Sequence, residues 1–209
     1  MSRAAELAKF IGDGTLGLGG AEDKKLVFDG NAQDFHIGLD DSADSLTIGL
    51  GSTLGTTSHM VFDANGHITK PLQSAFLVTK SGSQDNLSIN QFTTVTFDTE
   101  VFDQNGDFAS NAFTAPVTGR YQLNVHCYVQ NMDTASNYVQ VDLNTSNRVY
   151  YNIVEPDYNS DQDYFVFIIS MLADMDASDT ANVRVYLDNS GSAQMDVRPQ
   201  TFFSGYLVA

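Results

Sequence analysis

Basic side chains are scarce in this chain of 209 residues, which has 10 lysines and arginines against 26 aspartates and glutamates. The formal net charge of −16 argues against a nucleic-acid partner, because phosphate binding depends on clustered Lys and Arg. Nearly all the acidic residues are Asp, which favours turns and strand ends over helices. With 14 Phe and 9 Tyr, the composition predicts a loop-rich, all-β protein.

Long apolar runs and paired cysteines are also missing. Cys127 is the single cysteine and cannot form an intrachain disulfide, which fits assembly in a reducing cytoplasm. No apolar run approaches the roughly 20 residues needed to cross a bilayer. The N-terminus lacks the apolar core of a signal peptide. The sequence therefore predicts neither membrane insertion nor export by a signal peptide.

Residues 1–20 are predicted to be an anchoring segment. Ser2–Phe10 contains good helix formers and is followed by Gly12, which favours a short helix that stops there. An isolated helix of this length is marginal in water. We therefore expect it to become ordered by docking on another protein chain.

Residues 21–70 are predicted to form a glycine-rich β stalk or collar. Turn signals such as Asp63-Ala64-Asn65-Gly66 separate its short apolar pieces. The strands expected from Thr15 onward are Thr15–Leu18, Lys25–Phe28, Phe35–Leu39, Ser45–Leu50 and Met60–Phe62. Strands this short would bury little core within one chain. We therefore expect the stalk to find its core between chains, as in a trimeric fibre.

Residues 71–209 are predicted to form a globular head. Tyr121–Gln130 alternates apolar and polar residues, as a strand with one buried face does, whereas Phe165–Ile169 is unbroken apolar and is expected to be buried on both faces. Eight strands separated by turn-rich links predict a two-sheet, eight-stranded jelly-roll sandwich. The expected strands are Phe76–Thr79, Phe92–Phe97, Tyr121–Gln130, Tyr138–Leu143, Val149–Ile153, Tyr164–Met171, Val183–Leu187 and Phe202–Val208.

Two motifs in the head resemble a known family. The first comprises Phe102–Phe108 and then Phe113-Thr114-Ala115-Pro116-Val117-Thr118-Gly119-Arg120-Tyr121. The second is the ending Thr201-Phe202-Phe203-Ser204-Gly205-Tyr206-Leu207-Val208. Together they resemble the globular head of complement and tumour-necrosis-factor proteins. The resemblance implies homotrimers whose jelly rolls pack around a threefold axis.

The first third resembles the virion structural proteins and tail fibres of marine tailed bacteriophages. The segments that carry this similarity are Phe35–Ser42 with Leu46–Gly49, and Phe62-Asp63-Ala64-Asn65-Gly66-His67-Ile68-Thr69-Lys70-Pro71. No Gly-X-Y run of a collagen stalk precedes the head. The resemblance implies a phage appendage.

Acidic loops are the candidate metal sites. Asp103, Asn105 and Asp107 are similar to the first half of a calcium loop, but glycine falls at the fourth position and Thr114 replaces the terminal Glu. A plain strand-connecting turn is the favoured alternative. Further acidic clusters are Asp157, Asp161 and Asp163, and Asp174, Asp176 and Asp179. Copies of His36, His59 and His67 brought together on a threefold axis are another possible ion site.

No catalytic motif is recognisable. His126 and Cys127 are neighbours on a predicted strand, so they point to opposite faces, and Cys127 is expected to be a buried structural thiol. Tyr150, Tyr151, Tyr158 and Tyr164 could form either a glycan-stacking surface or subunit contacts.

The resulting hypothesis is a non-enzymatic virion surface protein made in the bacterial host cytoplasm. It would be a trimeric head fibre, capsid decoration or short tail fibre, bound through its N-terminus to a major capsid or tail component. The first alternative is a glycan-binding lectin or adhesin. The second is a polysaccharide depolymerase, which would require paired carboxylates.

Overall fold

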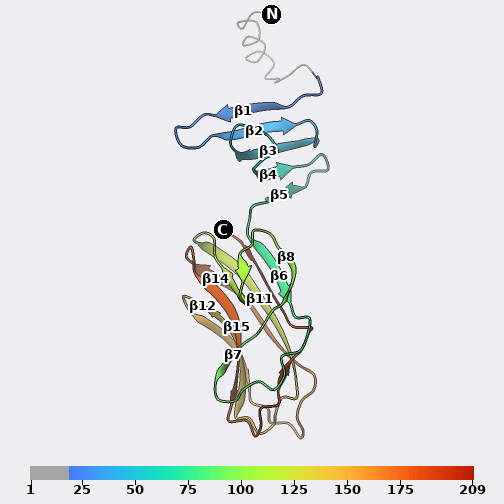
Figure 1. Cartoon of the computed structure of the whole chain (residues 1–209), viewed down its shortest axis with the longest axis vertical. Coiled ribbons are helices and arrows are strands. Elements are labelled where there is room, and N and C mark those ends of the chain that lie inside the picture. The colour runs from blue at the N-terminus through green and yellow to red at the C-terminus, as the bar shows by residue number, and fades with distance from the viewer. Residues whose placement is uncertain (1–18) are drawn as a thin grey trace, which may run out of the picture. The chain divides into compact units, whose positions relative to one another are not determined.

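The computed structural model describes residues 19–209, which form strands and turns and contain no helix, so none of them belongs to a helix that could cross a membrane. The expected helix Ser2–Phe10 and the expected strand Thr15–Leu18 lie outside this range. The chain divides into two compact units between Leu72 and Gln73 (Figure 1). The all-β prediction is therefore confirmed for residues 19–209.

The N-terminal unit is one antiparallel sheet whose strands follow one another in chain order (Figure 1). Its strands are β1 (Lys24–Phe28), β2 (Phe35–Asp40), β3 (Ser45–Leu50), β4 (Ser58–Phe62) and β5 (Ile68–Thr69). β1 to β4 lie where the sequence predicts them, and β5 is additional. The turn from β4 to β5 forms as expected, with Gly66 at φ 87°. Asp63 closes it, because its Oδ1 accepts from the backbone N–H of Asn65 (2.9 Å) and His67 (2.8 Å).

The head unit contains two six-stranded sheets. We call the first the β12 sheet; its order is β13-β12-β15-β10-β9, and β7 also pairs with β15. Its strands are β7 (Phe92–Thr94), β9 (Phe108–Ala109), β10 (Ala112–Thr114), β12 (Tyr138–Thr145), β13 (Val149–Val154) and β15 (Thr180–Asp188).

The second, the β11 sheet, has the order β14-β11-β17-β6-β8, and β16 also pairs with β11. Its strands are β6 (Ala75–Thr79), β8 (Thr99–Asp103), β11 (Gly119–Gln130), β14 (Phe165–Met175), β16 (Asp196–Val197) and β17 (Phe202–Leu207). The expected sandwich is present. The expectation of eight strands was too low because β8, β9, β10 and β16 were missed.

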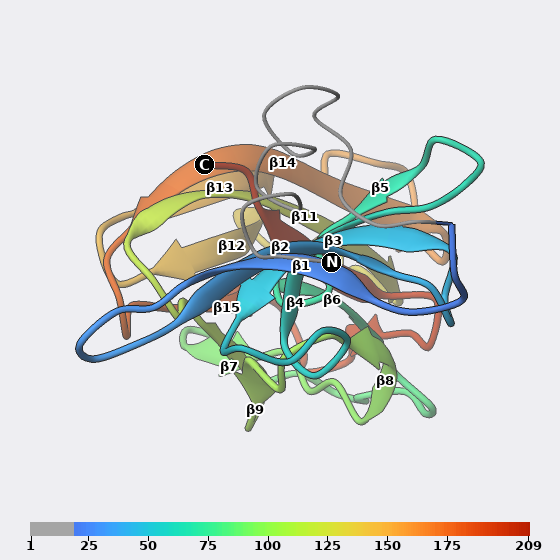
Figure 2. The same ribbon diagram turned by 90° about the horizontal axis from the view of Figure 1, so that it is seen from above.

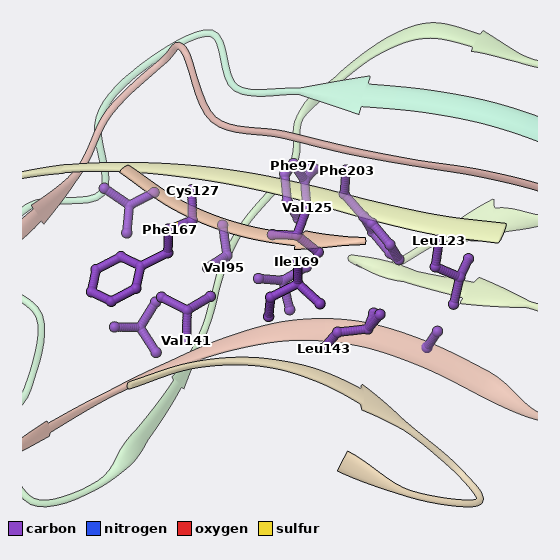
Figure 3. Close-up of a cluster of buried hydrophobic side chains, with 14 of the residues drawn as sticks. Val95, Phe97, Leu123, Val125, Cys127, Val141, Leu143, Phe167, Ile169 and Phe203 are labelled. Carbon is purple, nitrogen blue, oxygen red and sulfur yellow. The ribbon is translucent and has the colours of Figure 1, made fainter. Parts of the chain in front are cut away.

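The core of the head lies between these two sheets. In β11, every odd residue from Tyr121 to Val129 is buried, which confirms the alternation read from the sequence. Leu123 and Phe203 of the β11 sheet lie across the core from Leu143 of the β12 sheet (Figure 3). Gly205 of β17 allows this packing, because a Cβ atom there would lie 2.5 Å from Cδ2 of Leu123.

The prediction that Phe165–Ile169 is buried on both faces is wrong for the single chain. β14 alternates, with Phe167 and Ile169 buried in the core, whereas Val166 is 39% exposed and Ile168 is 63% exposed. The reason is that only one face of the β11 sheet packs on the β12 sheet. An apolar run therefore marks a second apolar surface, and that surface has no partner within residues 19–209 of one chain.

Candidate subunit interface of the head

The second surface is the face of the β11 sheet that points away from the core. A row of paired residues, Ile168, His126 and Phe202, crosses three adjacent strands, the edge strand β14 and its neighbours β11 and β17. The His126 ring stacks on Phe202, with centroids 4.7 Å apart and planes 3° apart. Leu172 (50% exposed) and Tyr206 (49% exposed) extend the apolar surface along β14 and β17. We call these residues, together with Val166 and the polar residues Gln122, Asn124 and Ser170 of the same face, the head face.

The polar side chains of the head face bond to one another. Gln122 Nε2 donates to Asn124 Oδ1 (3.1 Å) and to Ser170 Oγ (3.0 Å), and Ser170 Oγ donates to Asn124 Oδ1 (2.8 Å). Hydrogen bonds made within one chain lower the cost of covering these groups with another protein.

Charged side chains are missing from the centre of this face. The outward positions of 166–172, 122–128 and 202–206 contain no Asp, Glu, Lys or Arg. Depletion of charge and enrichment in aromatic residues are the compositional signs of a protein interface core. The sequence pattern alone did not identify Ile168 and Leu172 as candidate interface residues. The available signal was that β14 is apolar at both odd and even positions.

A shallow groove of about 400 Å³ continues the head face at the edge where β13 and β14 lie side by side (Figure 2). Val149, Tyr150, Tyr151 and Asn152 line it from β13, and residues 168–171 line it from β14. Tyr150 and Tyr151 are consecutive in β13 and point to opposite faces, so the two rings cannot form one stacking platform.

The predicted calcium residues lie in the turn between β8 and β9. Asp103 Oδ1 accepts from the backbone N–H of Asp107 (3.1 Å), and Oδ2 accepts from that of Phe108 (2.8 Å). These bonds support the turn-forming alternative. Asp107 Oδ2 is buried without a hydrogen-bond partner. Within residues 19–209, no group of three or more His, Cys, Asp or Glu side chains is arranged to hold a metal ion. Calcium binding at Asp103, Asn105 and Asp107 stays a prediction.

The other acidic clusters are used in local structure. Asp174 Oδ2 accepts from Arg148 Nη2 at 2.5 Å, and this hydrogen bond lowers the pKa of Asp174. Asp179 Oδ2 accepts from the backbone N–H of Asp176 (2.8 Å), and Asp161 Oδ1 accepts from that of Thr134 (3.0 Å). These carboxylates therefore stabilise the local chain conformation by accepting hydrogen bonds from the same chain.

Two histidines of the N-terminal unit interact with nearby groups of their own chain. His36 is 1% exposed, and its Nδ1 lies 2.9 Å from the carbonyl oxygen of Gly51. His67 Nδ1 lies 2.8 Å from Asp63 Oδ2, and the hydrogen bond from His67 lowers the pKa of Asp63. Each ring has one partner in its own chain, whereas His36 Nε2 is buried without a hydrogen-bond partner. An ion held by His36, His59 and His67 on a threefold axis stays a prediction.

Cys127 is a buried structural thiol, as predicted. Its side chain is in the head core, and burial raises its pKa to about 12. The reactive thiolate is therefore negligible near neutral pH. His126 lies on the opposite face of β11 and is not positioned as its base.

The two sheets and their strand orders define a jelly-roll sandwich. The chain belongs to the C1q family, because the C1q domain model matches residues 75–208. Members of this family are generally non-enzymatic binding proteins. A search of curated proteins gave no match.

Two solved structures are similar to the head. The globular domain of the zebrafish complement 1qA protein is 21% identical, with a TM-score of 0.52, over 66% of this chain and 98% of that chain. Murine APRIL at pH 8.0 is 11% identical, with a TM-score of 0.48, over 65% of this chain and 99% of that chain. The zebrafish structure supports the jelly-roll fold of the head.

Proposed function

We propose that this chain is a homotrimeric, non-enzymatic virion surface protein of a tailed bacteriophage, with the jelly-roll head projecting outward. The proposed trimer rests on one observation, namely that the head face is exposed and contains no charged side chain. Ile168, Leu172 and Tyr206 are each about half exposed or more, and contiguous apolar surface of this kind marks an interaction site. Three identical faces around one axis would cover one another and close the assembly.

The pattern of β14 supports this arrangement. In a trimer, Val166 and Ile168 would contact a neighbouring chain while Phe167 and Ile169 stay in the core. Both faces of the strand would then be buried, which accounts for its unbroken apolar sequence. The two head motifs that resemble complement and tumour-necrosis-factor proteins also imply homotrimers.

The virion location rests on the first 70 residues. Short sequence segments in this region resemble those of phage appendage proteins. Residues 1–20 would bind another virion component, such as the major capsid protein or a tail protein. Synthesis would take place in the host cytoplasm, where the single buried thiol Cys127 needs no oxidising compartment.

The test has two parts. Sedimentation equilibrium of the purified full chain should give three times the monomer mass of 22.8 kDa. Mass spectrometry of purified virions should detect the chain, and antibodies against the head should label the capsid or tail in electron micrographs. A monomer in solution would refute the trimer, and absence from virions would refute the virion role.

Glycan contact on the host surface is a second candidate function of the same head. Tyr151 (62% exposed) and Tyr164 (82% exposed) offer rings that could stack on sugars. Tyr164 already stacks on Tyr128, with centroids 6.4 Å apart. A glycan array with the full chain should show binding that Y151A or Y164A weakens. Equal signals from the wild type and both variants would remove these tyrosines as the site.

A further inference from the structure

The N-terminal sheet has one face made mainly of large apolar side chains along its five strands, with Lys24 at the start of β1 as its charged member. Register pairing aligns Leu26, Ile37, Ile48 and Met60 in one row across β1 to β4. We call this surface the stalk face. It comprises Leu26, Phe28, Phe35, Ile37, Leu39, Leu46, Ile48, Leu50, Met60, Phe62 and Ile68.

The opposite face is partly covered by the chain itself, around His36 and Thr47, whereas Val27 near its edge is 40% exposed. It presents small residues, including Gly38, Thr47 and Gly49, and the loop 51–57 folds back toward it. Leu54 of this loop is only 8% exposed, and the carbonyl oxygen of Gly51 contacts His36. A Cβ atom at Gly49 would lie 2.8 Å from the His36 ring, so this close packing requires glycine. The stalk face is thus the side that lacks a cover within residues 19–72.

The open area is large for a unit of this size. Six of the side chains are between 41% and 61% exposed: Leu26, Phe28, Phe35, Leu39, Leu46 and Ile68. With about 200 Å² for a large apolar side chain, they expose on the order of 550 Å². That reaches the upper range of about 300–600 Å² for the largest patch on a typical monomer. With the half-buried members added, it approaches the roughly 800 Å² that each partner contributes to a stable interface.

A second copy of this chain is the occupant that fits best. Only five residues separate the end of β5 at Thr69 from the start of β6 at Ala75, so this link reaches at most about 20 Å. If the head is a trimer, three stalk faces are held within this reach of their own β6 strands, at high effective concentration. Among the strand residues on this side of the sheet, the one charged group is Lys24, which forms an ion pair with Glu22 of its own chain. A specific foreign partner would require a broader pattern of polar and charged groups.

We propose that the stalk faces of three copies pack together around the threefold axis and form a second trimer contact, separate from the head face. This inference rests on the proposed trimer of the head. The three sheets share one apolar core between chains, and the glycine-rich faces partly covered by loop 51–57 point to water. Each sheet obtains from its neighbours the core that its short strands do not provide alone.

The test compares two variants of the full chain, Leu26→Asp and Val27→Asp. The two residues are consecutive in β1 and similarly exposed, at 44% and 40%, but they point to opposite faces. Amide hydrogen exchange is followed in residues 24–69, and sedimentation equilibrium gives the oligomeric state. We expect L26D to speed exchange of β1 to β4 by tenfold or more, while the head keeps the chain trimeric. V27D should exchange like the wild type.

The outcomes separate the two proposals. If the wild type is a monomer, the proposed trimer fails, and this inference fails with it. If the wild type is a trimer but L26D and V27D exchange alike, the stalk contact is refuted and the head trimer stands. If Ile168→Asp in the head leaves the trimer intact and L26D dissociates it, the chain trimerises through the stalk face, and the role of the head face is refuted.

Discussion

Replacing Ile168 with Asp should dissociate the head trimer. Ile168 is 63% exposed in the single chain and lies in the central row of the head face. Complete burial of an Ile side chain contributes about 1.5–3 kcal/mol, so burying this fraction contributes roughly 1–2 kcal/mol per chain and 3–6 kcal/mol per trimer. A carboxylate in the same place would add the cost of burying an unpaired charge.

The expected effect is a fall in the trimer association constant by at least two to four powers of ten, since about 1.4 kcal/mol corresponds to a factor of ten. Sedimentation equilibrium over a hundredfold range of concentration measures it. The matched control is I153D, because Ile153 is 46% exposed on the outward face of the β12 sheet. Circular dichroism checks that both variants are folded. If I168D associates as strongly as I153D, the head face is not the interface.

Three further predictions concern the head core and its loops. Gly205→Ala should destabilise the fold by about 1–3 kcal/mol in urea unfolding, because its Cβ would lie 2.5 Å from Leu123 Cδ2; an unchanged midpoint would contradict this packing. Asp133→Asn should cost about 1.5–3 kcal/mol, because the carboxylate accepts from Ser190 Oγ (2.8 Å) and from the backbone N–H of Ala135 (2.8 Å) and Ser192 (3.0 Å). Burial raises the pKa of Asp133, but these hydrogen bonds outweigh burial and lower the pKa below 3.8. The difference in unfolding free energy between wild type and D133N should therefore persist above pH 3.8. It should vanish as the pH falls through the folded-state pKa. The Cys127 thiol should not react with Ellman's reagent at pH 8 in the folded protein and should react fully in denaturant, because burial raises its pKa to about 12.

Side-chain periodicity was sufficient to predict the core strands of the head. The alternation of Tyr121–Gln130 appears in the structure as β11, with its odd residues buried. Three of the four missed strands are short, because β9 and β16 have two residues each and β10 has three; β8 has five residues, but only Val101 and Phe102 among them are apolar. Segments of this length contain too few residues for a period of two to be recognised. Their position depends on pairing with distant strands, as between Phe113 and Ala181.

The proposed interface could not be predicted from periodicity for a different reason. An apolar residue such as Ile168 looks the same whether it is covered by its own chain or by another copy. The structure separates the two cases, because Ile168 is exposed while its neighbour Phe167 is 0% exposed. The acidic turn at Asp103 was similarly ambiguous, since the same carboxylate can hold a cation or accept two backbone N–H groups. The structure shows that Asp103 accepts the two backbone N–H groups, and cation binding stays a prediction.

The pairing of β17 has a consequence for how the head folds. β17 lies between β11 and β6, so that Gly205 pairs with both Leu123 and Phe76. Until residues 202–207 have left the ribosome, β6 and β11 have no strand to join them, although more than a hundred residues of the head have been synthesised. Contacts so distant in sequence slow folding to milliseconds or seconds. The β11 sheet is therefore completed only after residues 202–207 have been synthesised, and its apolar edges stay available to other chains until then.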